Sequence, residues 1–152
     1  MYDTFEGMAK PGEDDVDLAG KTAASYFETR LKEILTNFVE KKSSNDSLLT
    51  NLVKNKVLER NYHTFFNWEA KNANVFFSIF GEEFKHNACA DVNSNEDLKK
   101  SIIDFLDLGN NRNKLAHQNF AHINMDKTAE EVYSQYRSAL MFIKYIEKKL
   151  NV

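Results

Sequence analysis

The chain has 152 residues, which is enough for one domain and too few for two of ordinary size. Five glycines and one proline favour long helices over a sheet-rich fold, and the single cysteine excludes an intrachain disulfide. No apolar run approaches the roughly 20 residues that cross a bilayer, and the N-terminus lacks the pattern of a secretory signal. We therefore expect a cytoplasmic protein with no membrane contact.

The charge is unevenly spread along the chain. The net charge is −3, but residues 1–20 hold six acidic residues against one lysine, so the remainder carries +2. A weakly basic body can attract phosphate groups locally, although charge alone favours an ordinary solvated surface. We expect residues 1–16 to form a flexible acidic leader and residues 17–152 to form one helical domain.

The first half of the domain contains three predicted helices. Residues 17–42 carry an apolar stripe at three- and four-residue steps, and Asp46 is a plausible N-cap for a second helix that extends to about Arg60. The apolar residues of that second helix are expected to face inward: Leu48, Leu49, Leu52, Val53 and Val57. Residues 61–66 are predicted to be a connection with buried aromatics, and residues 68–80 a third helix that ends near Gly81. Residues 85–94 are polar and are predicted to form a loop.

Capping patterns mark the helices of the second half. Ser94-x-x-Asp97 resembles a capping box, and Gly109 is a candidate helix stop. A fresh helix capped by Asn110 and Asn111 would then run to about Ile123, unless one continuous helix kinks at Gly109 instead. Thr128-x-x-Glu131 is a capping box that opens the last helix, whose apolar stripe is the clearest in the chain. The predicted fold class is all-α, a bundle of about five helices.

The segment Arg112-Asn113-Lys114-Leu115-Ala116-His117 combines a permanent cation with an imidazole. Residues five apart on an α-helix point about 140° away from each other, so Arg112 and His117 do not share a face. A common site therefore needs Arg112 to reach around from a helix start, or a second chain to contribute. If Gly109 breaks the helix, Arg112 lies in a first turn, where free backbone N–H groups favour a phosphate.

These residue types suit RNA cleavage without a metal or cofactor. A base activates the ribose 2′-hydroxyl, an acid protonates the departing 5′-oxygen, and a cation stabilises the phosphorane. His117 can give and take a proton near neutral pH, and Arg112 can bind a phosphate through two N–H groups.

The run RNKLAHQNF resembles the Arg-x4–6-His signature of the HEPN superfamily, and especially its RNxxAH form. With SYFETRLKEIL and WEAKNANVFFSIFG, it looks like the RiboL-PSP type of HEPN domain over roughly residues 20–150. The resemblance implies a helical bundle that forms a homodimer, with two Arg/His pairs in one cleft. It also implies a metal-independent endoribonuclease, often a toxin or an antiviral defence effector, with RNA such as tRNA or mRNA as the substrate.

Carried over to this sequence, the resemblance makes Arg112 and His117 the catalytic pair and Asn113 the supporting polar residue. Lys114, Gln118 and Asn111 are candidate RNA contacts, although helix capping also explains Asn111 and solvent-facing polarity also explains Gln118. One alternative is a non-catalytic HEPN module that binds RNA or a partner protein. Another is a regulatory subunit whose cleft is masked by a partner such as an antitoxin.

Other chemistries find little support in the sequence. No spacing of histidines with Cys89 suggests a zinc site, and no Gly-rich phosphate loop is present. A thiol nucleophile at Cys89 lacks matching context. His122 lies five residues past His117 and is a weak catalytic candidate, whereas His63 and His86 stand alone.

Overall fold

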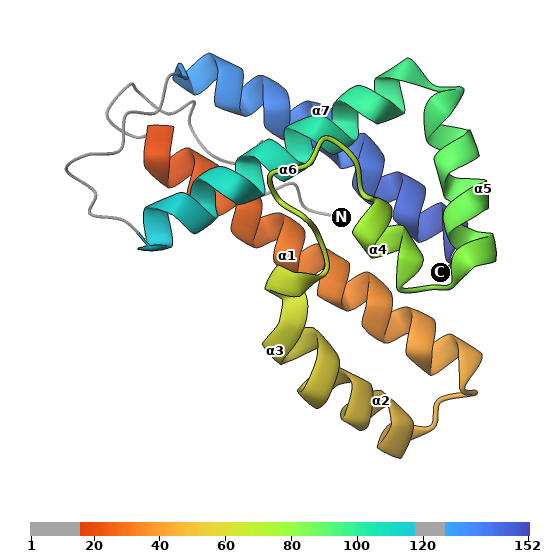
Figure 1. Cartoon of the computed structure of the whole chain (residues 1–152). Helices are drawn as coiled ribbons and strands as arrows, with labels where there is room; N and C mark the ends of the chain where they lie inside the picture. Colours follow the sequence, from red (N-terminus) through yellow and green to blue (C-terminus); the bar gives the residue numbers. More distant parts are fainter. Residues whose placement is uncertain (1–15, 118–126) are drawn as a thin grey trace.

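The computed structural model describes residues 16–117 and 127–152, and side chains for residues 19–114 and 127–152. Within these ranges the chain is helical and contains no strand, which confirms the all-α prediction. Three long helices form the body: α1 (Val16–Lys42), α6 (Glu96–His117) and α7 (Ala129–Lys149). α6 packs most extensively against α7, and both pack against α1 (Figure 1).

Aromatic side chains fill the space between these helices. The Phe27 ring of α1 stacks on Tyr136 of α7 and lies 5.7 Å from the Phe105 ring of α6, measured between centroids. Phe105 in turn lies 5.1 Å from the Phe142 ring of α7. All four rings are almost fully buried. Their burial, with that of the aliphatic residues around them, is the main stabilising contribution to the bundle.

Ser101 joins α6 to α7 at the centre of this interface. Its side chain is fully buried, and its hydroxyl donates to the carbonyl of Ser138 at 2.6 Å. The same hydroxyl accepts from the backbone N–H of Phe142 at 2.8 Å. Ser138 and Phe142 stand four positions apart on α7, so the serine hydroxyl bridges a donor and an acceptor of one helical turn. This contact fixes the register of the two helices.

The second predicted helix is a run of three elements: α2 (Ser47–Val53), the π-helical turn η2 (Lys54–Leu58) and α3 (Glu59–Asn61). The run returns along the C-terminal half of α1 (Figure 1). Asp46 accepts from the N–H of Leu49 at 3.0 Å, which confirms the predicted N-cap. The predicted inward stripe is wrong at Leu48, Leu49, Leu52 and Val57, which are exposed. α2 rests against α1 on one side only, so its remaining apolar face has nothing to cover it among the described residues.

The segment between Tyr62 and Asn93 differs most from prediction. The 3₁₀ turn η3 (Tyr62–Thr64) leads into bends, and only α4 (Asn74–Ser78) is helical within the predicted 68–80 helix. The side chains of Asn67 and Asn72 accept from backbone N–H groups two residues later, which favours turns over helix. The loop predicted over residues 85–94 is wrong, because α5 (Glu82–Asn93) covers it. Gly81 precedes α5 with a φ of +99°, a conformation suited to glycine.

Of the capping predictions, the box at Thr128 is confirmed, since its hydroxyl accepts from the N–H of Glu131 at 3.1 Å. The predicted box at Ser94 is displaced by one residue, because the Asn95 side chain caps α6 by accepting from the N–H of Leu98. The helix break at Gly109 is wrong, and α6 continues through it to His117. Gly109 is buried beneath the indole of Trp68, so a side chain there would collide with the ring. Close packing therefore explains this glycine, and a helix stop does not.

Candidate functional site

The candidate residues of the Arg112 segment lie on the second half of α6. Asn111, Arg112 and Asn113 are half-buried, and Lys114 is exposed. His117 is the last residue that α6 includes, and its side chain lies outside the part of the chain that the structure describes. Gln118 also lies outside that part, and so do Phe120, His122 and the end of the helix predicted to reach Ile123. The described part of the candidate site is therefore Arg112 and its surroundings.

The first-turn position predicted for Arg112 is wrong. α6 begins at Glu96, so Arg112 lies deep within the helix. Backbone N–H groups at this depth bond to carbonyls four residues earlier and have no capacity for a phosphate. Any affinity for an anion at this point must come from side chains.

Arg112 forms an ion pair with α1. Its Nη1 lies 2.9 Å from Oε1 of Glu28, with 19% of the arginine side chain and 28% of the glutamate side chain exposed. A guanidinium has five N–H donors, so one contact to a carboxylate leaves others available to a second acceptor. The side chain is thus held at one edge while remaining accessible to solvent.

Glu28 also binds Lys32 one turn further along α1. Its Oε2 lies 2.8 Å from the lysine Nζ, which is 3.6 Å from Oε2 of Glu59 on α3. The same Nζ lies 5.9 Å from the centre of the Tyr62 ring, within the range of a cation–π contact. Arg112, Glu28, Lys32, Glu59 and Tyr62 are called the Arg112 cluster below.

The charges of this cluster perturb the titration of two of its members. Burial favours the protonated form of Glu28, but hydrogen bonds and charges from Lys32 and Arg112 outweigh it, so the pKa of Glu28 falls below its usual 4.5. Burial raises the pKa of the Tyr62 hydroxyl far above its usual 10, against the opposing charge of Arg112. At neutral pH Glu28 is therefore an anion and Tyr62 is neutral.

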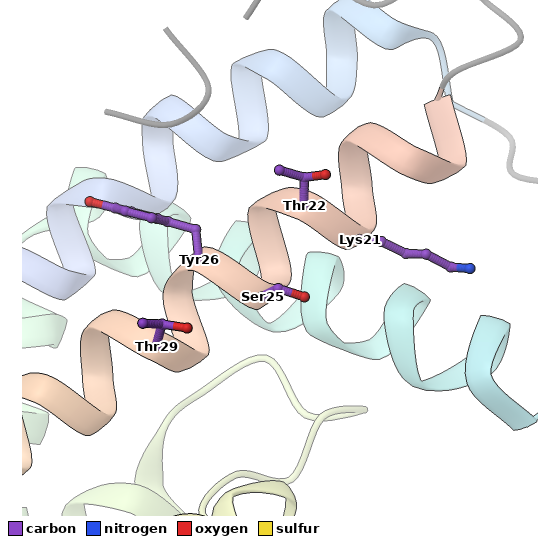
Figure 2. Close-up of a pocket in the computed structure, with 5 residues that line it drawn as sticks. All are labelled: Lys21, Thr22, Ser25, Tyr26 and Thr29. Carbon is purple, nitrogen blue, oxygen red and sulfur yellow. The ribbon is translucent and has the colours of Figure 1, made fainter. Parts of the chain in front are cut away.

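Two hollows run along α1 beside the cluster. The first, of about 510 Å³, is lined by Lys21, Thr22, Ser25, Tyr26 and Thr29. Figure 2 shows that all five come from α1, with Lys21 and Tyr26 pointing in opposite directions. The second, of about 520 Å³, is lined by Thr29, Lys32, Glu33, Thr36, Asn37, Lys54 and Glu59. The two hollows share Thr29, and the second contains two residues of the cluster, Lys32 and Glu59.

Sequence reasoning missed Glu28, Lys32, Glu59 and Tyr62. A partial signal existed for two of them, because Glu28 and Lys32 are four residues apart on a predicted helix, the spacing of a favourable ion pair. Nothing in the sequence indicates that this pair faces Arg112, which lies 84 positions later.

The remaining candidates show no comparable site. Cys89 is half-buried, with its Sγ 3.4 Å from Oδ1 of Asn74, and His63 and His86 are exposed. Among the described residues, no group of three His, Cys, Asp or Glu side chains is arranged to hold a metal ion. No helix within these ranges is both long and apolar enough to cross a membrane.

Comparison with known families gives a match over residues 21–152, to the model of the RiboL-PSP-HEPN domain. The chain belongs to the RiboL-PSP-HEPN family. The matched range begins five residues into α1 and includes both sides of the Arg112–Glu28 ion pair. HEPN domains are all-α, many are ribonucleases or RNA-binding modules, and they often form dimers. No curated protein and no solved structure matches the chain.

Proposed function

We propose that this HEPN domain is a metal-independent endoribonuclease of the cytoplasm that acts as a toxin or antiviral defence effector. The observation that carries the proposal is the Arg-Asn-x-x-x-His segment on α6 of a HEPN domain, with the partly exposed Arg112 side chain paired to Glu28. The first hollow, lined by Lys21, Thr22, Ser25 and Thr29, offers one ammonium and three hydroxyl groups to a polyanionic ligand, whereas Glu33 and Glu59 balance Lys32 and Lys54 in the second.

In the proposed reaction, His117 takes the proton of a ribose 2′-hydroxyl, whose oxygen attacks the adjacent phosphorus. The bond to the 5′-oxygen breaks, and that oxygen receives a proton from a second acid, such as the imidazole of a symmetry-related copy. Arg112 stabilises the added negative charge on the phosphorane. The products are a 2′,3′-cyclic phosphate and a 5′-hydroxyl.

The unbroken α6 makes a second copy more important to this proposal. With no helix start near Arg112, residues 112 and 117 lie on a continuous helix and their Cα–Cβ vectors diverge by about 140°. In a homodimer with two Arg/His pairs in one cleft, an arginine of one copy and a histidine of the other can face the same phosphate. Asn113, Lys114, Asn111 and Gln118 are the proposed supporting residues or RNA contacts.

The test is incubation of the wild-type protein with total RNA and with tRNA in EDTA, followed by mapping of the fragment ends. We expect His117→Ala to lower the cleavage rate by about 10²–10⁴ and Arg112→Ala by about 10²–10³. His86→Ala and Arg137→Ala are matched controls, because both residues are exposed and lie outside the α6 segment. Light scattering should report a dimer. Wild-type protein that cuts no RNA at several pH values would exclude the nuclease.

The second candidate function is a non-catalytic HEPN module that binds RNA or a partner protein, such as an antitoxin. The observation that favours it is the ion pair itself, because a guanidinium already bound to a carboxylate is also what a structural pair looks like. RNA binding without any cleavage product, weakened by Arg112→Ala, would support this alternative. Cutting that appears only after a co-purified partner is removed would instead identify a masked nuclease.

A further inference from the structure

We propose that Glu28 is the positioning residue of Arg112, and that it sets the orientation of the guanidinium toward the scissile phosphate. The inference rests on the proposed nuclease function and adds to it a residue from α1. Glu28 does not take or give a proton in this proposal. It acts on the reaction only through Arg112.

The first argument is the geometry of the ion pair. An arginine side chain has four rotatable bonds and adopts one orientation only when a partner holds it. Glu28 supplies that partner across the α1–α6 interface, with Oε1 2.9 Å from Nη1. Since the contact uses Nη1, the other N–H groups of the planar guanidinium acquire a defined direction.

The second argument concerns what holds Glu28. Its other oxygen lies 2.8 Å from Lys32 Nζ, and Lys32 is itself within 3.6 Å of Glu59 and 5.9 Å of the Tyr62 ring. The carboxylate is therefore bound at both oxygens, from α1 and from α6. A group fixed in this way makes a rigid support for Arg112, as preorganised catalytic groups require.

The third argument separates positioning from simple attraction of RNA. A carboxylate beside a phosphate repels it, so Glu28 does not improve RNA binding. Its benefit must appear in the transition state, through the orientation of Arg112. Loss of Glu28 should therefore lower kcat and leave KM unchanged or lower.

The chain offers a matched control for this test. Arg30 of α1 forms an ion pair with Glu147 of α7, and the exposed fractions of the two side chains are 15% and 33%. The pair joins two helices, as Arg112–Glu28 does, with similar burial. Glu147→Gln removes the carboxylate charge of this pair without touching the Arg112 cluster.

The first measurement is rotation about the guanidinium bond of Arg112, followed by NMR of ¹⁵N-labelled arginine side chains. The sequence has four arginines, so Arg112→Lys assigns the signal. We expect slow rotation for Arg112 in the wild type and in Glu147→Gln, and fast rotation in Glu28→Ala. Equal rotation rates for Arg112 in all three proteins would overturn the inference without any reference to activity.

The second measurement is steady-state cleavage of a short RNA. We expect kcat to fall about tenfold in Glu28→Gln, which keeps a neutral acceptor, and about 10²-fold in Glu28→Ala. Glu147→Gln should keep the wild-type kcat. The kcat ratio of Glu28→Gln to wild type should stay constant between about pH 6 and pH 9, because the carboxylate is ionised throughout that range. The charged groups that determine this ionisation are Arg112, Lys32 and, through Lys32, Glu59.

The outcomes separate the two proposals. If the wild type cuts RNA and Glu28→Ala cuts equally well, the positioning role is excluded and the nuclease stands. If Glu28→Gln abolishes the acidic limb of the pH profile, Glu28 is the general base and the positioning role is again excluded. Wild-type protein that cuts no RNA would overturn both proposals.

Discussion

Gly109→Ala is expected to destabilise this protein, against the usual effect of replacing a helical glycine. In an exposed helix interior, alanine is favoured over glycine by about 1 kcal/mol. Here the added Cβ would lie 2.1 Å from Cζ3 and 2.5 Å from Cε3 of Trp68. Ordinary contact begins at 3.4 Å, so the indole or α6 must move by at least about 1.3 Å.

The indole has little freedom to move. Its Nε1 donates to the carbonyl of His63 at 2.9 Å, and its ring lies 5.1 Å from Phe66 and 5.8 Å from both Tyr62 and Phe105, measured between ring centroids. Overpacking a constrained site costs about 1–3 kcal/mol. We take the upper cost of about 3 kcal/mol because the ring is constrained, and subtract the helix preference of alanine, about 1 kcal/mol. The free energy of unfolding should then fall by about 2 kcal/mol. For a chain of this length that lowers Tm by about 4–8 °C.

The assay is urea or thermal unfolding followed by far-UV circular dichroism, because the described chain is helical and this signal does not depend on Trp68, the only tryptophan. A double-mutant cycle provides the control, because in a Trp68→Ala background the collision is absent. There Gly109→Ala should be neutral or stabilising, with a coupling energy of about 2–3 kcal/mol. If Gly109→Ala stabilises the wild type by about 1 kcal/mol, the packing explanation of this glycine is wrong.

Two further predictions concern the fold. Ser101→Ala removes the hydroxyl that bridges Ser138 and Phe142, and should cost about 1 kcal/mol in urea unfolding, because the two backbone groups can then bond to each other. The exposed Ser134→Ala should change stability by less than about 0.5 kcal/mol, and equal losses from both would contradict the bridge. The second prediction concerns the pH dependence of stability. The folded-state pKa of Glu28 is lowered from 4.5, so its ionised form stabilises the fold above that pH. This contribution is lost as the pH falls through the folded-state pKa. The stability difference between wild type and Glu28→Gln should therefore be largest above about pH 5 and should shrink as the pH falls below 4.5; a difference that grows in acid would show that the carboxylate is not paired.

The sequence predicted correctly those elements that are determined by residues within a single short segment. The apolar stripe of α7 and its cap at Thr128 lie within one segment, and Asp46 sits directly before the helix that it caps. α5 was missed because its inward positions are weakly apolar, with only Ala88 fully buried, and partly buried Phe84 and Val92 one turn to either side. A stripe of this kind does not stand out from a polar loop.

The errors arose where a distant residue decides the local structure. Gly109 has the sequence signature of a helix stop, and only Trp68, 41 positions earlier, shows that it is a packing glycine. Leu48 and Leu52 have the spacing of a buried stripe, yet Leu48 is 81% exposed because α2 meets the body on its other side. Arg112 is a candidate site residue from its motif, whereas its partner Glu28 could be found only once α1 and α6 were placed together.

The charge balance of the Arg112 cluster determines what the cluster could contribute to the proposed reaction. With two cations and two carboxylates, Arg112, Lys32, Glu28 and Glu59 carry no net formal charge within one chain. Such a cluster would attract RNA only weakly in the ground state, so the proposed RNA binding depends on cations outside it, of which Lys21 and Lys114 are candidates. A neutral but rigidly oriented cluster can still stabilise charge that appears only as the phosphorane forms. In the proposed reaction, substitutions at Lys21 or Lys114 should therefore change KM and its salt dependence, whereas substitutions within the cluster should change kcat.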